Sequence, residues 1–421
     1  MNRTINTALC AILLLCSTAF GSGFQINEQG ARAMAMGGAF TAAALDPSIL
    51  YFNNAGITQM SGFKLMLGTT LISPSSSFRG VTPKVNETKM ESQLFTPSHF
   101  YATYQITDKL FAGLGFNTPF GLGTKWPKDW DGRFVSMEIS VRTFNFNPVV
   151  AYKIDDNLSI GVGLQYAFGD VLINRDIKIP SPILGSTIAN VNLKGDASSA
   201  MGFTAGLMYH TNCDLTFGVS YRSEVKFDFT GTATSTGGSA LAASSLPAGD
   251  IAASLTTPQQ LVVGVAYQAT PKLLLSTDFQ WVGWSSYDSL KVNFTDPTKT
   301  DIASPRLYEN NYTMRLGANY QYDDLLDLSA GILYDKNPVK DQFVDPTLPD
   351  ADRLGFSVGA GYKVMSNLSI NASYMFLRFY QRTITNSMVS SITYDPTLSL
   401  PFNGTYNSTA NLFSLSLSYN L

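Results

Sequence analysis

The chain ends in FSLSLSYNL, residues 413–421, where apolar residues alternate with serine and asparagine. Successive side chains of a β-strand point to opposite faces, so this stretch predicts a strand with one apolar face and one small, polar face. LSIGVGLQYAFG (158–169) and LGFSVGAGYKV (354–364) follow the same rule. A soluble sheet would carry many charged residues on its second face, whereas these stretches carry mostly Gly, Ser and Gln there. Such a face suits a crowded, wet interior.

The composition of the 421 residues points the same way. Only 14% are charged, against about 25% in an ordinary soluble domain, while 45% are hydrophobic and 12% are aromatic. The apolar and aromatic content excludes a disordered chain. A net charge of −3 without a basic cluster argues against a nucleic-acid binder. Three cysteines are too few for a disulfide scaffold.

Residues 1–21 predict a secretory signal peptide. Arg3 supplies the positive charge, residues 8–16 form an apolar run, and Ala19 and Gly21 are small residues at the expected cleavage site. Cleavage there would leave Cys213 without a second cysteine, so no intramolecular disulfide is expected. No other apolar run approaches the roughly 20 residues of a membrane helix. An exported chain of this kind without a helical span indicates a transmembrane β-barrel.

Alternating segments recur along the rest of the chain and predict an all-β fold, a 14-stranded antiparallel transmembrane β-barrel over residues 61–421. The expected strands lie near 61–74, 93–106, 109–122, 136–154, 157–175, 196–211, 214–230, 256–269, 272–285, 307–321, 325–335, 352–364, 367–383 and 409–421. Short polar turns alternate with long loops, as periplasmic turns and extracellular loops do in such barrels. The long loops are expected near 75–92, 123–135, 176–195, 231–255, 286–306, 336–351 and 384–408.

Residues 22–60 lack this alternation and are rich in glycine and alanine. Asp46-Pro47 and Asn53-Asn54 are residues typical of breaks and turns. Fourteen strands enclose more space than their own side chains can fill. We therefore expect residues 22–60 to form a compact hatch inside the lumen; the alternative is a periplasmic tail outside the barrel.

The third expected strand is irregular, because NTPFGLG at 117–123 places one proline and two glycines where a strand should continue. Proline removes a ladder hydrogen bond and glycine relaxes the backbone. Thr118, Pro119 and Gly121 therefore mark either a defect in the barrel wall or a simple turn at a strand end. The residues alone leave both open.

The loop after this strand contains Trp126 and Trp130, and the next long loop is apolar from Ile179 to Ile188. Exposed apolar loops are costly unless they pack together or bind something apolar. Packing and ligand capture both remain open. Enzyme signals are poor: Ser98 and His99 are strand neighbours that point to opposite faces, and no metal-spaced histidine pair is present. We predict no enzyme activity, no metal and no cofactor.

At this point the chain resembles one family, the FadL/TodX-type outer-membrane transporters of long-chain fatty acids and hydrocarbons. The matching segments occur in family order and are SGFQINE (22–28), PFGL (119–122), WDGR (130–133), NFNP (145–148), YRSEV (221–225), YD (334–335) with PV (338–339), and LPDADR (348–353). The C-terminal residue is Leu421 rather than the family's usual Phe.

The resemblance implies a 14-stranded barrel with an N-terminal hatch and a kinked third strand that opens sideways. It implies a lumenal pocket where Phe24 contacts the ligand. By position, Gly121 matches the kink, and Asp335 matches an acidic residue beside it. Arg175 matches a lumenal arginine near a bound carboxylate, and Arg306 lies closest to a second basic residue.

The family's hatch carries an Asn-Pro-Ala turn, which Asn53 and Ala55 match. Asn54 stands in the place of its proline, so the turn is less rigid here. Expected ligand contacts are therefore Phe24, Arg175, Arg306, Trp126 and Trp130.

These observations predict passive transport of long-chain fatty acids or other hydrophobic compounds across the bacterial outer membrane by a monomer. A ligand would be captured in a groove of the long loops, pass to the lumenal pocket, and leave through the third strand into outer-membrane lipid. The alternatives are a general diffusion porin and an outer-membrane lipid hydrolase.

Overall fold

The computed structural model describes residues 23–421 except 83–84, 182–184, 239–245 and 390–400. The predicted signal peptide lies outside the described residues. No helix in the described part of the chain is both long enough and apolar enough to cross a membrane.

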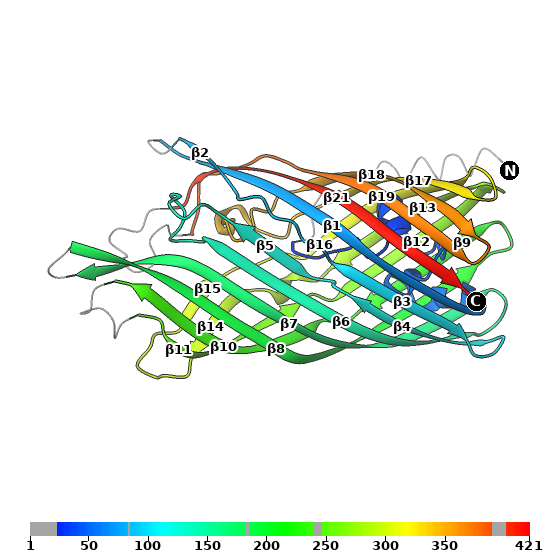
Figure 1. Cartoon of the computed structure of the whole chain (residues 1–421), viewed down its shortest axis with the longest axis horizontal. Coiled ribbons are helices and arrows are strands. Elements are labelled where there is room, and N and C mark those ends of the chain that lie inside the picture. Colours follow the sequence, from blue (N-terminus) through cyan, green and yellow to red (C-terminus); the bar gives the residue numbers. More distant parts are fainter. Residues whose placement is uncertain (1–22, 83–84, 182–184, 239–245, 390–400) are drawn as a thin grey trace.

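The strands form one antiparallel sheet that closes on itself, with β1 paired to β21 from Lys64↔Asn420 to Gly80↔Gly404 (Figure 1). This confirms the predicted 14-stranded barrel. Its walls, in chain order, are β1 (Phe63–Gly80), β3 (Ser98–Gln105), β4 (Leu110–Asn117) continued by β5 (Gly121–Lys125), β6 (Glu138–Lys153), β7 (Leu158–Ser181), β8 (Gly185–His210), β9 (Leu215–Arg222) continued by β10 (Val225–Gly237), β11 (Gly249–Thr257) continued by β12 (Gln260–Thr270), β13 (Leu273–Val282), β16 (Asn311–Gln321), β17 (Leu326–Asp335), β18 (Arg353–Met365), β19 (Leu368–Phe379) and β21 (Gly404–Asn420).

Side chains of the C-terminal stretch alternate between the outer surface and the bore, as the sequence predicts. Phe413, Leu415 and Leu417 are 54, 51 and 42% exposed on the outer surface, while Ser414 and Ser416 are buried. Exposed apolar side chains at every second position need lipid as their solvent, and the small serines make room for contents in the bore.

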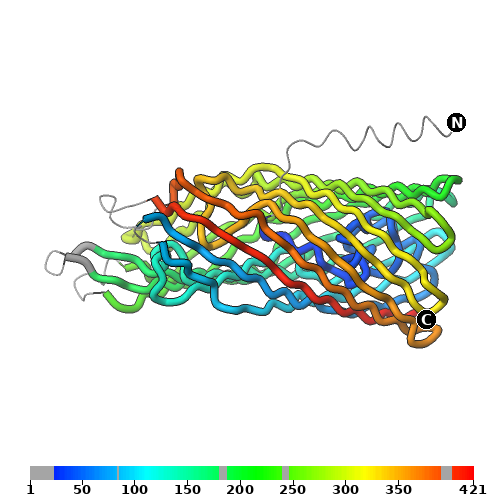
Figure 2. The backbone as a smooth tube through the Cα atoms, turned by 90° about the horizontal axis from the view of Figure 1, so that it is seen from above, coloured from blue at the N-terminus to red at the C-terminus, as the bar shows by residue number. Residues whose placement is uncertain are grey.

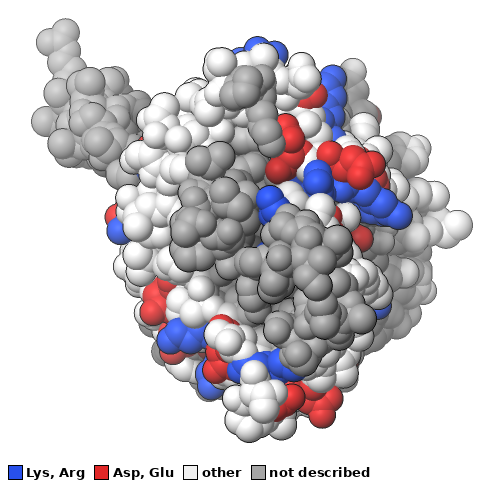
Figure 3. Space-filling model, turned by 90° about the vertical axis from the view of Figure 1, so that its left-hand side faces the viewer, with Lys and Arg blue, Asp and Glu red and all other residues white. Residues whose placement is uncertain are grey.

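The strands run from tight turns at one end to long loops at the other, and the C-terminus lies at the turn end (Figure 1). The loops carry β2 (Glu87–Lys89), β14 (Ser289–Phe294), β15 (Ile302–Pro305), β20 (Arg382–Ile384) and the short 3-10 helices η3 (Trp284–Ser286) and η4 (Asp341–Phe343). Acidic and basic side chains alternate around the rim of this end (Figure 3).

The expected loop over 176–195 is wrong. β7 and β8 remain paired as far as Ser181↔Gly185, so most of that range is strand. Its apolar residues are packed. Ile177, Ile179, Val191 and Leu193 are buried in a cluster with neighbours from β10, β11 and β14. These neighbours give the apolar residues a buried core, and the strand alternation continues through residue 179 on β7.

Residues 23–60 lie inside the barrel, toward the turn end (Figure 2). They form α2 (Ala31–Ala35), α3 (Ile49–Phe52) and η1 (Asn54–Gln59), joined by turns. This confirms the hatch and excludes the external tail. Small residues allow the close fit: a Cβ on Gly206 would lie 2.2 Å from Oδ1 of Asn53.

Polar bonds fix the hatch to the wall. Arg32 pairs with Asp327 at 2.6 Å, and the Asp278 carboxylate accepts the backbone N–H groups of Phe40 and Thr41, both at 3.0 Å. Buried Arg222 donates to Gln165 at 2.6 Å and to the carbonyl of Tyr51 at 3.1 Å, with its guanidinium 4.7 Å from the centre of the Tyr51 ring. These contacts come from β9, β13 and β17, so the hatch is held on several sides.

Candidate functional site

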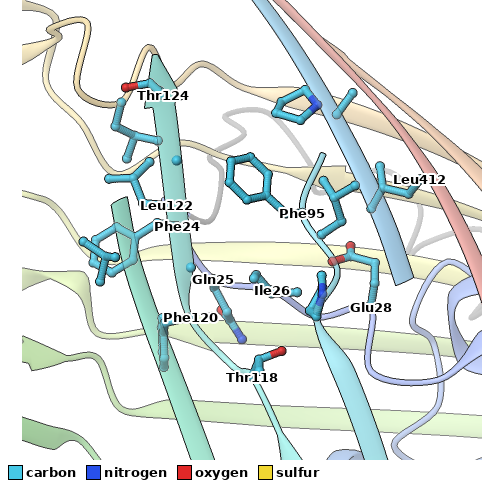
Figure 4. Close-up of a pocket in the computed structure, with 18 of the residues that line it drawn as sticks. Phe24, Gln25, Ile26, Glu28, Phe95, Thr118, Phe120, Leu122, Thr124 and Leu412 are labelled. Atoms are coloured by element: carbon cyan, nitrogen blue, oxygen red, sulfur yellow. The ribbon is translucent and has the colours of Figure 1, made fainter. Parts of the chain in front are cut away.

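A cavity of about 490 Å³ lies between the first residues of the hatch and the wall formed by β1, β5 and β6 (Figure 4). Phe24 and Ile26 border it from the hatch, and Phe95, Leu122 and Leu412 border it from the loops and strands. Most of its lining is apolar, so the cavity suits a hydrophobic molecule.

The third strand is interrupted at this cavity. β4 pairs with β3 up to Phe100↔Phe116 and with β6, whereas β5 forms a ladder with β6 alone among the described strands. Pro119 has no N–H to offer between them. Residues 117–123 therefore interrupt the strand, which continues along β6 beyond the break and does not end in a simple turn.

The hatch supplies the hydrogen bonds that the ladder lacks at this break. Gln29 donates its side-chain amide to the carbonyl of Thr118 at 2.9 Å. The N–H of Ile26 bonds the carbonyl of Pro119 at 2.9 Å, and the N–H of Gly121 bonds the carbonyl of Phe24 at 3.0 Å. Because buried backbone groups need partners, the start of the hatch and the broken strand form one unit.

The cavity is bordered by both faces of the wall at this break. Val141 and Thr143 face the bore, whereas Phe116 and Phe144 belong to the outer face. Their same-face neighbours Leu114 and Phe146 are both 41% exposed on the outer surface.

Phe24 is buried in an aromatic cluster. Its ring lies 4.7 Å from Trp284, 6.1 Å from Phe120 and 6.0 Å from Tyr287, centre to centre. Gly23 has a positive φ of 61°, and a Cβ there would lie 2.7 Å from the Trp284 ring, so the approach of the chain to this cluster requires glycine.

A second, smaller cavity of about 60 Å³ lies on the loop side. Phe24, Leu122, Val141 and Leu348 border both cavities. Phe24 therefore stands between the loop-side space and the larger cavity.

Charged groups gather at one end of the larger cavity. Arg353 borders it and donates from Nε and Nη2 to the same oxygen of Asp335, at 2.8 and 2.7 Å. Glu28 of the hatch and Asp350 of the loop between β17 and β18 also border it. Burial raises the pKa of Asp350 to about 7, against the opposing effect of Arg353.

Arg306 borders the smaller cavity and is 9% exposed. Its Nη1 pairs with Asp345 at 2.5 Å, so this guanidinium already has a carboxylate partner. Burial opposes the charge of Arg306, but Asp345 and its neighbouring tyrosines outweigh that effect and raise its pKa.

Arg175, Trp126 and Trp130 border neither of these two cavities. Arg175 lies on β7 opposite Val191, in the part of the hairpin that continues toward the loops. The two tryptophans stack at 4.4 Å, are 1 and 4% exposed, and pack with Phe78 and Phe402. Their packing gives the loops a core.

The remaining sequence-predicted residues are distributed between the hatch and the break. Asn53 and Asn54 hold the hatch turn to the wall, since Asn53 donates to the carbonyl of Leu207 at 3.0 Å and Asn54 to Thr204 at 2.6 Å. The N–H of Ala55 bonds the side chain of Asn53 at 3.1 Å. Thr118 and Gly121 border the larger cavity.

Sequence reasoning missed Gln29, Phe95, Glu28, Asp350 and Arg353. Glu28 and Gln29 lie in the hatch, Phe95 lies before β3, and Asp350 and Arg353 lie where the loop after β17 leads into β18; no periodic pattern marks any of them as a site residue. Glu28, Asp350 and Arg353 stand in two segments that carry the family resemblance, SGFQINE (22–28) and LPDADR (348–353), and this resemblance is the sequence signal that could have indicated them.

Among the residues that the structure describes, no group of three or more His, Cys, Asp or Glu side chains could hold a metal ion.

Fold and site together define a plugged outer-membrane barrel with a lumenal apolar cavity. Residues 12–421 match the family model described as outer membrane protein transport protein (OMPP1/FadL/TodX), so the chain belongs to this family of outer-membrane transporters of fatty acids or hydrophobic compounds. The family and location predicted from the sequence are confirmed, and the loop end of the barrel is extracellular.

Similar proteins include outer membrane protein P1 of Haemophilus influenzae, 29% identical over 390 residues that cover 86% of this chain and 80% of the relative. The long-chain fatty acid transport protein of Escherichia coli O6:H1 is 26% identical over 403 residues, covering 87 and 89%. A FadL homologue of Pseudomonas aeruginosa has a similar crystal structure, with a TM-score of 0.85 at 20% identity and coverage of 95 and 100%. The toluene transporter TodX of P. putida gives 0.72 at 18% identity, covering 93 and 98%.

Proposed function

We propose that this protein carries hydrophobic molecules through the side of its barrel. A molecule gathered among the extracellular loops passes Phe24 into the larger cavity and leaves between β5 and the segment before β3 into the outer leaflet. The observation that carries this proposal is the lining of the cavity, which combines bore-facing Val141 with outward-facing Phe116 and Phe144.

The energetics favour a lateral exit. An acyl chain released into the periplasm would expose its methylene groups to water at about 0.8 kcal/mol each, or on the order of 12 kcal/mol for some fifteen groups. Exit into lipid avoids most of this cost. No energy source is then needed, because the ligand moves toward the phase in which it dissolves best.

Phe24 and its neighbours Gln25 and Ile26 separate the loop-side cavity from the exit, and they are bonded to the broken strand. We infer that this segment detaches during transport. Residues 22–60 otherwise stay in place as the hatch.

Arg175 and the loop tryptophans would act earlier, among the loops. Each barrel has its own cavity and break, so we expect a monomer, which light scattering of the detergent complex tests.

Replacing residues 118–120 with Thr-Val-Thr tests the exit. The change removes Pro119 and lets β4 continue into β5. Uptake of radiolabelled hydrophobic compounds by cells should fall at least tenfold, with normal amounts of folded protein in the outer membrane. Uptake at the unmodified rate would exclude the side exit.

A general porin is the alternative that the residues leave open, and the filled bore argues against it. Phe40, Ile49 and Leu50 of the hatch are all 0% exposed. Single-channel recordings distinguish the two: a porin conducts steadily, whereas we expect no steady conductance here.

A further inference from the structure

The charged end of the larger cavity is acidic. Four charged residues border the cavity, namely Glu28, Arg142, Asp350 and Arg353. Arg142 is an outer-face residue whose side chain is 66% exposed and bonded to Asp170 at 2.9 Å. The charge of Arg353 is balanced by Asp335 through two hydrogen bonds. Two carboxyl groups, Glu28 and Asp350, are thus left in excess.

Both excess carboxyl groups come from segments that enclose the bore-side part of the cavity. Glu28 from the hatch and Leu412 from β21 both border this cavity (Figure 4). Its carboxylate accepts the N–H of Asn27 at 3.1 Å. Asp350 is 2% exposed, its Oδ1 accepts the N–H of Ala351 at 3.0 Å, and its Oδ2 accepts no hydrogen bond from the described residues.

The buried Oδ2 of Asp350 calls for a donor, since an unpaired buried acceptor is costly. A hydroxyl group on a ligand can supply that donor. An ionised carboxylate has no proton to donate and would bring a further negative charge next to Glu28 and Asp350, where water is scarce and repulsion between ionised carboxyl groups is strong. Arg353, the cation that could attract a ligand carboxylate in the cavity, is already bonded to Asp335.

We infer that the larger cavity selects uncharged hydrophobic molecules, with a hydroxyl as the preferred polar end, over ionised carboxylates. This inference rests on the proposed function and names its substrate class. Fatty alcohols, hydrocarbons and protonated acids fit the cavity, and fatty-acid anions are disfavoured.

The titration of Asp350 agrees with this arrangement. Burial and Asp335 favour its neutral form, and Arg353 and Arg382 favour its ionised form. With its pKa near 7, both forms are present at neutral pH, and both accept a hydrogen bond from a hydroxyl.

The test compares two ligands with the same chain, 1-dodecanol and dodecanoate, on the purified full-length mature barrel at pH 8.5, where dodecanoate is ionised. Radiolabelled ligand binding should favour the alcohol at least tenfold. In the double variant Glu28→Gln with Asp350→Asn, the ratio of alcohol to carboxylate affinity should fall at least tenfold, and Glu28→Gln alone should lower it in part.

Glu87→Gln is the matched control, because Glu87 is an exposed residue of β2 away from the cavity lining and its loss changes the net charge by the same single unit as Glu28→Gln. Its ratio should equal that of the unmodified protein. Equal or tighter binding of dodecanoate at pH 8.5 overturns the inference while leaving lateral transport intact. An unchanged ratio in a folded double variant also overturns it. Binding of neither ligand overturns the proposed function as well.

Discussion

Locking the start of the hatch to the broken strand should stop transport. Gln25 and Phe120 face each other as an isolated antiparallel bridge, flanked by the bonds from Ile26 to Pro119 and from Gly121 to Phe24. This is a non-hydrogen-bonded pair, whose Cα atoms are typically about 4.5 Å apart, within the range of a disulfide. The variant Gln25→Cys with Phe120→Cys, made with Cys213→Ser, places a reversible lock at this point.

The size of the effect follows from what holds the segment. The two backbone hydrogen bonds contribute about 0.5–1.5 kcal/mol each, and burial of the Phe24 ring about 1.5–3 kcal/mol. A total near 4 kcal/mol leaves the detached form populated at roughly one molecule in a thousand. Thermal detachment is thus frequent enough to serve transport, and a covalent bond abolishes it.

Uptake of a labelled hydrophobic compound should fall at least tenfold in oxidised cells and recover after mild reduction. The reduced variant is its own control, since it carries the same altered side chains. Cross-linking is verified by digesting the oxidised protein without reduction and measuring the mass of the two peptides joined by the disulfide between positions 25 and 120. Wild-type uptake by the fully cross-linked barrel would refute detachment as a step of transport.

Three further changes probe the cavity and the hatch. In Gly123→Val, the new Cβ would overlap the Phe95 ring, so the ring should move into the larger cavity and lower uptake severalfold. Undiminished uptake would contradict passage of the ligand through this cavity. Asp278→Leu leaves two hatch amides unbonded at about 1–3 kcal/mol each, so protease sensitivity and conductance should rise, whereas Asp278→Asn, which keeps an acceptor, should change them little. Asp350 has a pKa of about 7 in the folded protein, above its usual value near 4, so the free energy of unfolding should decrease as pH rises through this interval. Urea unfolding from vesicles at several pH values should show a smaller slope of this free energy against pH for Asp350→Asn. An equal slope in the variant and the unmodified protein would contradict the assignment.

The barrel could be predicted because its determinant is local. Alternation over 413–421 fixes which face meets lipid, whereas Pro119 marks an irregularity that the residues alone leave open between a wall defect and a simple turn. The ends of the strands were harder to predict. The range 176–195 contains prolines, and the packing of the cluster around Ile177 and Leu193 explains why most of it is strand.

The cavity could be predicted only in outline. Phe24 and Gly121 follow from the family resemblance, but Glu28 and Phe95 reach the site through the path of the hatch and of the loop before β3. That path is set by pairing across the barrel, which a single sequence does not reveal. The same holds for Trp126 and Trp130, which fit ligand capture as well as packing until Trp126 is seen stacked on Trp130, and Trp130 beside Phe78 and Phe402.

The firmly seated hatch has a consequence for the cell that makes this protein. In the proposed lateral route, the part of the barrel toward the turns stays filled by buried hatch side chains such as Phe40 and Leu50 throughout delivery. On this proposal, the membrane would hold many copies and still exclude water-soluble compounds, because only molecules that dissolve in lipid would pass.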